Sequence, residues 1–124
     1  MKKIIYVLVA LLLVAGVVYI IMAPPKPGEY DEFAQCLTDS GAKYYGAFWC
    51  PNCQNQRALF GRSYKYVPYI ECSTPDSQGQ LQVCRDAGIT AYPTWVFADG
   101  EKVTGTQSLE ALAEKTSCIL PNIE

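Results

Sequence analysis

The sequence predicts an α/β domain, with helices flanking a small central mixed sheet, preceded by one transmembrane helix. The first observation is the order of the elements over residues 30–120, which reads helix, strand, helix, strand, helix, strand hairpin, helix. A βαβ unit followed by a ββα unit around one sheet accounts for each of them. The second observation is the uncharged apolar run at residues 4–23, since about 20 such residues form a helix that crosses a bilayer.

The flanks of the apolar run predict its orientation and its fate. Lys2 and Lys3 precede it, and positive charge stays in the cytoplasm, so we expect the rest of the chain to lie outside. A cleaved signal peptide is the alternative. Ala23 could end a cleavage site, but Ile21 is large for the −3 position and Pro24 would follow the cut. We therefore expect residues 1–23 to be a membrane anchor or uncleaved signal.

The remaining chain divides into a linker and one domain. Residues 24–29 are rich in proline and predict a stiff linker. Residues 30–124 are enough for one compact domain. Without Lys2 and Lys3 the chain has 8 basic and 12 acidic residues, a formal charge of −4. No basic cluster is present, so the composition gives no support for binding nucleic acid.

The first half of the domain is predicted as helix 30–39, strand 42–48, helix 51–60 and strand 66–72. Ser40-Gly41 and Gly61 end the two helices. The first strand is apolar on both faces, which is typical of a central strand that is covered on both sides.

The second half is predicted as a polar loop at 73–79, a short helix 80–87, strands 94–97 and 101–104, and a last helix. Ala98-Asp99-Gly100 between the strands is a strong hairpin signal. Trp95 and Phe97 are expected in the core. Ser108 is expected to cap the last helix, whose inner face would be Leu109, Leu112, Ala113, Thr116 and Leu120.

The motif Trp49-Cys50-Pro51-Asn52-Cys53 directly follows the first predicted strand and predicts a redox dithiol. Cys50 falls at the N-cap of a helix, and Pro51 at the first helical position, which proline favours. The unpaired N–H groups and the dipole of that first turn stabilise a thiolate over a thiol. We therefore expect Cys50 to be the catalytic nucleophile and Cys53 to resolve the mixed disulfide.

Two other readings of the motif are a structural disulfide and half of a zinc site. A zinc site needs a second closely spaced pair, and Cys72 and Cys84 are too far apart. Copper is disfavoured because the chain has only two methionines and no histidine. We expect no metal and no cofactor, because the dithiol itself carries two electrons. Lys43 and Arg57 either lie near the dithiol or are solvated surface charges, and we favour the second interpretation.

Six cysteines in so short a chain indicate an oxidising compartment. Setting the motif aside, the other four allow three pairings. We favour structural disulfides Cys72–Cys84, across the polar loop, and Cys36–Cys118, between the first and last helices of the domain. The second closes a long loop, for which the chain-entropy model gives about 4 kcal/mol. Alternatively, Cys72–Cys84 is a second redox relay, although neither cysteine begins a predicted helix.

The Trp-Cys-x-x-Cys motif together with Tyr92-Pro93-Thr94 before the hairpin resembles the thioredoxin fold over residues 42–118. Four segments, 45–54, 71–73, 88–95 and 108–112, look like the thioredoxin-like domain fused to vitamin K epoxide reductase homologues in bacteria and plants. In that family the domain trades disulfides with a quinone-reducing four-helix membrane enzyme. Here a single anchor helix replaces that enzyme, so the resemblance implies a separate partner.

The resemblance also implies roles for neighbours of the dithiol. It implies that Pro93 is cis and pairs, through its preceding backbone, with a bound peptide. Trp49 and Tyr92 would either form an apolar rim for substrates or serve as packing residues. Pro51-Asn52 looks more like the Pro-x of oxidising and glutaredoxin-type proteins than the Gly-Pro of thioredoxins. Tyr44 stands where thioredoxins carry a buried aspartate.

These observations predict a membrane-anchored, single-pass thiol–disulfide oxidoreductase with its domain in the periplasm or extracellular space. Its substrates would be the thiols or disulfides of exported proteins. The resemblance favours disulfide formation with a quinone-linked membrane partner of the vitamin K epoxide reductase type. The alternatives are a reductase for cytochrome maturation or repair, and a non-catalytic binding module that uses the surface near Tyr92 and Trp95.

Overall fold

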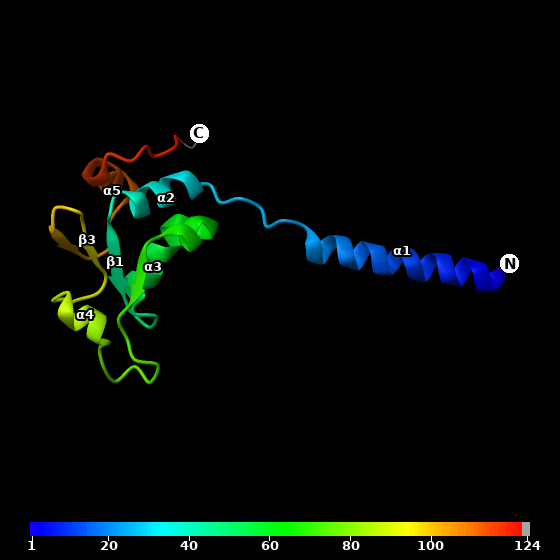
Figure 1. Ribbon diagram of the computed structural model, residues 1–124, viewed down its shortest axis with the longest axis horizontal. Helices are drawn as coiled ribbons and strands as arrows, with labels where there is room; N and C mark the ends of the chain where they lie inside the picture. Colours follow the sequence, from blue (N-terminus) through cyan, green and yellow to red (C-terminus); the bar gives the residue numbers. More distant parts are fainter. Residues whose placement is uncertain (123–124) are drawn as a thin grey trace.

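The computed structural model describes residues 1–122, and its first element is the helix α1 (Lys2–Met22). Every α1 side chain is exposed, and the helix extends away from the rest of the molecule on an extended linker (Figure 1). An 18-residue window of α1 has a mean hydropathy of 3.0, so the helix is long and apolar enough to span a membrane. It ends where Ala23 turns to extended backbone (φ −61°, ψ 130°), because a residue before proline is disfavoured in the helical region.

A four-stranded mixed sheet forms the centre of the domain, in the order β2-β1-β3-β4. The strand β1 (Lys43–Gly46) pairs in parallel with β2 (Tyr69–Glu71) and antiparallel with β3 (Thr94–Val96), which pairs antiparallel with β4 (Lys102–Thr104). The helix α3 (Pro51–Phe60) makes the crossover from β1 to β2. The sheet confirms the predicted α/β class, and the βαβ and ββα halves form a thioredoxin-like fold.

The central strand β1 is covered on both faces, as its sequence predicts. Tyr44 faces the larger core, to which α2 (Asp31–Asp39), α3 and α5 (Leu109–Thr116) contribute. Tyr45 belongs to a smaller cluster on the other face, with Cys72, Cys84 and Ile89 around the short helix α4 (Gln82–Asp86). Trp95 and Phe97 are buried in the larger core, as expected.

The strands are shorter than predicted because local hydrogen bonds remove their ends from the sheet. The predicted strand 42–48 stops at Gly46, since the carbonyl of Ala47 accepts from the Cys50 N–H in the turn that leads into α3. The start of the predicted strand 66–72 is wrong: Gly61–Tyr66 forms a 3-10 helix, η1. The Val67 N–H donates to the Tyr64 carbonyl and closes the last turn of η1.

Three predicted helices have different ends in the structure. The helix α2 begins at Asp31 rather than at residue 30. The helix α4 begins at Gln82, because Gln80 forms a β-bridge with Ser73 instead. The last helix, α5, stops at Thr116 because Ser117 adopts a left-handed conformation (φ 59°), so Leu120 packs on the core from beyond the helix.

The predicted division into residues 1–23, 24–29 and 30–124 stays a prediction. Contacts with the domain begin within the predicted linker, where the Gly28 N–H donates to Asp31 Oδ2 at 3.0 Å. The last two residues of the third part, 123–124, lie outside the described residues.

Candidate active site

The two cysteines of the motif lie at the N-terminus of α3. Cys50 is the N-cap residue, with an extended backbone (φ −75°, ψ 122°), and Pro51 is the first residue of the helix. The Cys53 N–H donates to Cys50 Sγ at 3.4 Å. Both cysteines are free, with 6% and 5% of their surfaces exposed. A free N–H of the first turn, that of Cys53, thus meets the Cys50 sulfur, as expected for an N-cap side chain.

A cis proline loop lies against Cys50. The Tyr92–Pro93 bond is cis, and the Cys50 thiol donates to the Tyr92 carbonyl at 3.7 Å. Tyr92 comes 42 residues after Cys50 in the chain, so the fold rather than the local sequence brings them together.

The predicted neighbours of the dithiol gather around it. The ring of Tyr92 packs edge-on against Trp49 at 6.1 Å between centroids. The indole N–H of Trp49 donates to Ser73 Oγ at 2.8 Å, yet 46% of its surface is exposed. Thr106 Oγ1 donates to the Asn52 carbonyl at 3.1 Å. Trp49 therefore both packs on Tyr92 and presents an apolar surface beside Cys50.

Cys53 lies deeper and borders a different space. It lines a cavity of about 310 Å³ whose lining includes neither Cys50 nor Tyr92. Burial raises the pKa of the Cys53 thiol to about 11, with a smaller upward effect from Cys50. A thiol with this pKa holds its proton at neutral pH.

Gly46 makes the close approach around Cys53 feasible. A Cβ at this position would lie 3.1 Å from Cys53 Sγ and 3.0 Å from Cε2 of Tyr69, with the Tyr44 hydroxyl at 3.5 Å. The three groups therefore converge on the space that the missing side chain leaves. The Tyr44 hydroxyl also donates to the Cys53 carbonyl at 3.2 Å.

A cluster of polar and aromatic side chains lines the Cys53 cavity, and the sequence analysis missed it. Its lining includes Arg57, Tyr64, Tyr69 and Glu71. The Tyr69 hydroxyl donates to Glu71 Oε2 at 2.5 Å, and the Arg57 guanidinium lies 4.9 Å from the centre of the Tyr64 ring. The spacing of Tyr69 and Glu71, two residues apart on one strand, was the available signal, because it puts both on the same face.

The two basic residues near the motif in sequence differ in their placement. Arg57 is exposed but borders the cavity of Cys53, so it is more than a solvated surface charge. Lys43 is exposed at the start of β1, whereas the dithiol follows the end of that strand.

The other four cysteines form two disulfides. Cys36 bonds to Cys118 at a sequence separation of 82, and Cys72 bonds to Cys84 at a separation of 12. Cys72 and Cys84 are fully buried, and the alternative that this pair is a second redox relay stays a prediction. Within residues 1–122 no three histidine, cysteine or acidic side chains gather as a metal site.

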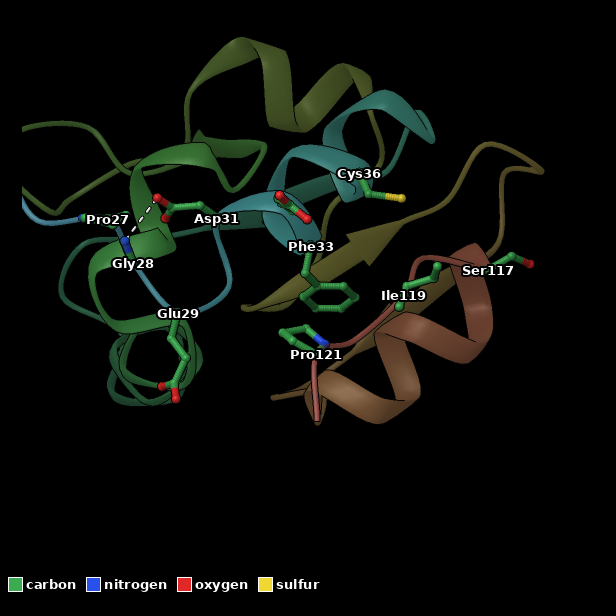
Figure 2. Close-up of a pocket in the computed structure, with 10 residues that line it drawn as sticks. Pro27, Gly28, Glu29, Asp31, Phe33, Cys36, Ser117, Ile119 and Pro121 are labelled. Carbon is green, nitrogen blue, oxygen red and sulfur yellow. Dashed lines mark hydrogen bonds between the residues drawn. The ribbon is translucent and has the colours of Figure 1, made fainter. Parts of the chain in front are cut away.

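A second cavity, of about 620 Å³, lies away from the dithiol between the linker, α2 and the segment after α5. Figure 2 shows Phe33 and Pro121 facing each other in it, with Asp31 held by the Gly28 N–H on the linker side. Its lining includes Cys36 but neither cysteine of the motif.

The fold and the site define a class: a thioredoxin-like domain with a free Cys-x-x-Cys pair at a helix N-terminus beside a cis proline. No family model matches the chain. The chain is similar to the thiol-disulfide oxidoreductase LTO1 of Arabidopsis thaliana, with 42% identity over 88 residues. The match covers 67% of this chain and 23% of LTO1, so the chain spans about a quarter of that relative's length.

Proposed function

We propose that this chain is a membrane-anchored, extracytoplasmic thiol–disulfide oxidoreductase that promotes disulfide formation in exported proteins. In the reduced pair Cys50 attacks a disulfide, and in the oxidised pair a substrate thiolate attacks Cys50. Cys53 forms the internal disulfide with Cys50. The observation that carries the proposal is the position of Cys50 Sγ, which accepts from a free N–H of the first turn of α3 and contacts the backbone before a cis proline. The name of the similar plant protein supports the same chemistry.

The compartment and the partner are parts of the same proposal. The helix α1 could hold the domain at a membrane surface, and two disulfides suit an oxidising compartment. The recycling partner is a separate quinone-reducing membrane enzyme of the vitamin K epoxide reductase type, and no metal or organic cofactor takes part. The similarity to LTO1 supports an exchange of disulfides, since LTO1 is named for it.

The activity is tested by oxidative refolding of a reduced, disulfide-containing protein with the full chain in detergent and glutathione disulfide as the oxidant. We expect the chain to accelerate refolding and Cys50→Ser to abolish the acceleration. A Cys53→Ser variant is the matched control, because it should trap mixed disulfides through Cys50. Full activity of Cys50→Ser would contradict the proposal. If Cys50 were alkylated no faster than a cysteine in an unfolded chain, the result would favour a non-catalytic binding module.

The direction of electron flow is tested by the reduction potential of the Cys50–Cys53 pair in glutathione buffers. A value near or above about −180 mV would place the chain with oxidising catalysts. A value near about −270 mV, as in thioredoxin, would contradict disulfide formation and indicate a reductase. The partner is tested by reoxidation of the reduced chain in vesicles that contain a quinone and the four-helix enzyme, with vesicles that lack the enzyme as the control.

A further inference from the structure

The proton of Cys53 has to leave and return in every cycle of the proposed function, on which this inference rests. When Cys53 resolves a mixed disulfide, its sulfur bonds to Cys50 Sγ, the bond from Cys50 to the other sulfur breaks, and that sulfur leaves with the electron pair. The Cys53 proton must go to another group, because burial raises the pKa of this thiol to about 11. In the reverse step Cys53 is the leaving group and needs a proton. The requirement is therefore the same in either redox direction.

Few groups face Cys53, and most of them are poor proton acceptors. Tyr44 comes from β1, Arg57 from α3, Tyr64 from η1, and Tyr69 and Glu71 from β2, with Cys50 as the other cysteine. Burial raises the pKa of Tyr44 and of Tyr69, and raises that of Tyr64 to about 12. A guanidinium does not accept a proton, because it is always protonated in proteins.

The carboxylate of Glu71 is the remaining acceptor, and it is held in a fixed orientation. Its Oε1 accepts from the N–H groups of Phe48, Cys72 and Ser73 at 3.3, 3.0 and 2.8 Å. Its Oε2 accepts from the Tyr69 hydroxyl at 2.5 Å. With one oxygen fully engaged by backbone, the second is the one that can exchange a proton through Tyr69.

The cavity connects Glu71 and Tyr69 with Cys53. All three residues line it, and its volume of about 310 Å³ leaves room for several waters at roughly 30 Å³ each. The edge of the Tyr69 ring and Cys53 Sγ both reach the space above Gly46. The cavity thus offers the proton a path from the thiol to Tyr69 or water, and from there to Glu71.

We propose that Glu71 is the proton acceptor for Cys53, reached through the Tyr69 hydroxyl and water in the cavity. As Cys53 attacks, its proton passes into this relay, and the relay ends with Glu71 protonated and Tyr69 neutral. When a substrate thiolate attacks Cys50 of the oxidised pair, the same proton returns to the departing Cys53 sulfur. Glu71 then acts through its neighbours and holds the proton close to the reaction.

The test separates the two chemical steps in the full chain in detergent. The reduced chain is mixed with glutathione disulfide, quenched with acid, alkylated and analysed by mass spectrometry. Mixed-disulfide formation reports attack by Cys50, and loss of the bound glutathione reports attack by Cys53. The variants are Glu71→Gln, which keeps an acceptor for the backbone N–H groups, and Tyr69→Phe. The controls are Glu114→Gln, exposed on α5, and Tyr66→Phe, exposed on η1 and outside the lining of the cavity.

For Glu71→Gln we expect resolution to slow by at least about 10-fold at pH 7, since general acid–base transfer typically contributes 10²-fold or more. The mixed disulfide should accumulate, with its rate of formation within about twofold of the parent. The difference should shrink toward pH 10.5, where solvent base ionises Cys53 directly. Tyr69→Phe should slow the same step with the same pH trend, while both controls resolve at the parent rate.

Resolution at the parent rate in Glu71→Gln, or a slowing of equal size at pH 7 and pH 10.5, would overturn the inference. The second result would indicate a structural effect. If the circular dichroism spectrum of Glu71→Gln differs from that of the parent chain, the variant has not folded correctly. Tyr69→Phe then tests the inference, through its resolution rate at pH 7 and the change in that rate toward pH 10.5. Failure of the proposed function looks different: the parent chain itself would not form the mixed disulfide at Cys50 faster than its unfolded form does.

Discussion

At the scale of the residue, Cys53 differs from an ordinary thiol because it is buried, with 5% of its surface exposed. Burial is the largest cause of its raised pKa, about 11 against an ordinary value of 9.0. A raised thiol pKa means that the folded state favours the neutral form. The stability from this preference is present below about pH 9 and is lost as pH rises toward 11.

We predict that Cys53 reacts slowly with iodoacetamide at neutral pH. In a Cys50→Ala variant, whose only free thiol is Cys53, the alkylation rate should rise with a midpoint well above the ordinary 9.0. The same variant unfolded in urea is the control and should titrate near the ordinary value. A folded midpoint at or below 9 would mean that water reaches Cys53 freely.

Gln56 is a second residue whose role depends on complete burial. Its Oε1 accepts from the N–H of Gln107 at 2.7 Å and from the Trp95 indole at 3.2 Å, and its Nε2 donates to the Gln107 carbonyl at 3.0 Å. It therefore ties α3, one turn after Cys53, to the segment before α5. Buried groups that lose such partners cost about 1–3 kcal/mol each.

We predict that Gln56→Ala lowers the free energy of unfolding by about 3 kcal/mol, from the lost hydrogen bonds and the cavity that remains. Urea unfolding followed by tryptophan fluorescence measures it. Asn55→Ala is the matched control, because Asn55 is exposed on the same helix, and it should change the value by less than about 0.5 kcal/mol. A loss for Gln56→Ala as small as the control's would show that water replaces the amide.

These residue-scale features also mark what the sequence could predict of the site. Cys50, Pro51 and Cys53 were predictable because helix capping and thiol chemistry act within one turn. Tyr69 and Glu71 were not singled out, because their relation to Cys53 depends on the parallel pairing of Tyr44 with Tyr69 and of Gly46 with Glu71. Strand pairing between residues 25 positions apart has no signal in the local sequence. The burial of Gln56 has none either, because it is a polar residue in a helix that mixes polar and apolar residues.

At the scale of the element, the type and order of the elements were predictable and their ends were not. Hydrophobic periodicity acts over the length of an element, so every predicted helix and strand is present. The ends depend on single hydrogen bonds, as where the Ala47 carbonyl binds the Cys50 N–H. Tyr66 shows the same limit: its aromatic side chain favours a strand, but the turn closed by Tyr64 and Val67 places it in η1.

The helix α5 is an element whose start the sequence predicts correctly. Ser108 is its N-cap, and its hydroxyl accepts from the Ala111 N–H at 3.1 Å. We predict that Ser108→Ala lowers the free energy of unfolding by about 1 kcal/mol, a typical cost for a lost cap. Ser108→Asp keeps an acceptor and should restore most of the loss. If both variants have the same urea midpoint of unfolding as the parent chain, packing of Leu109 and Leu112 alone determines where α5 begins.

At the scale of the whole molecule, the disulfide Cys36–Cys118 ties the helix α2 to the segment that follows α5. It links α2 with the residue two positions beyond α5, and Figure 1 shows α2 and α5 close together, away from α4. The dithiol follows the C-terminal end of β1. Stability and reactivity should therefore be separable in this chain.

We predict that the double variant Cys36→Ala, Cys118→Ala lowers the free energy of unfolding by about 4 kcal/mol. The chain-entropy model gives this size for a loop of 82 residues, and it is a large part of the 5–15 kcal/mol typical of a domain. Urea unfolding of the full chain in detergent, without reductant, measures the loss. The rate at which Cys50 forms a mixed disulfide with glutathione should stay within about twofold, because the bridge does not touch the first turn of α3. A loss below about 1 kcal/mol would show that the unfolded chain is already compact without the bridge, and a large fall in the Cys50 rate would show that the bridge and the dithiol are coupled.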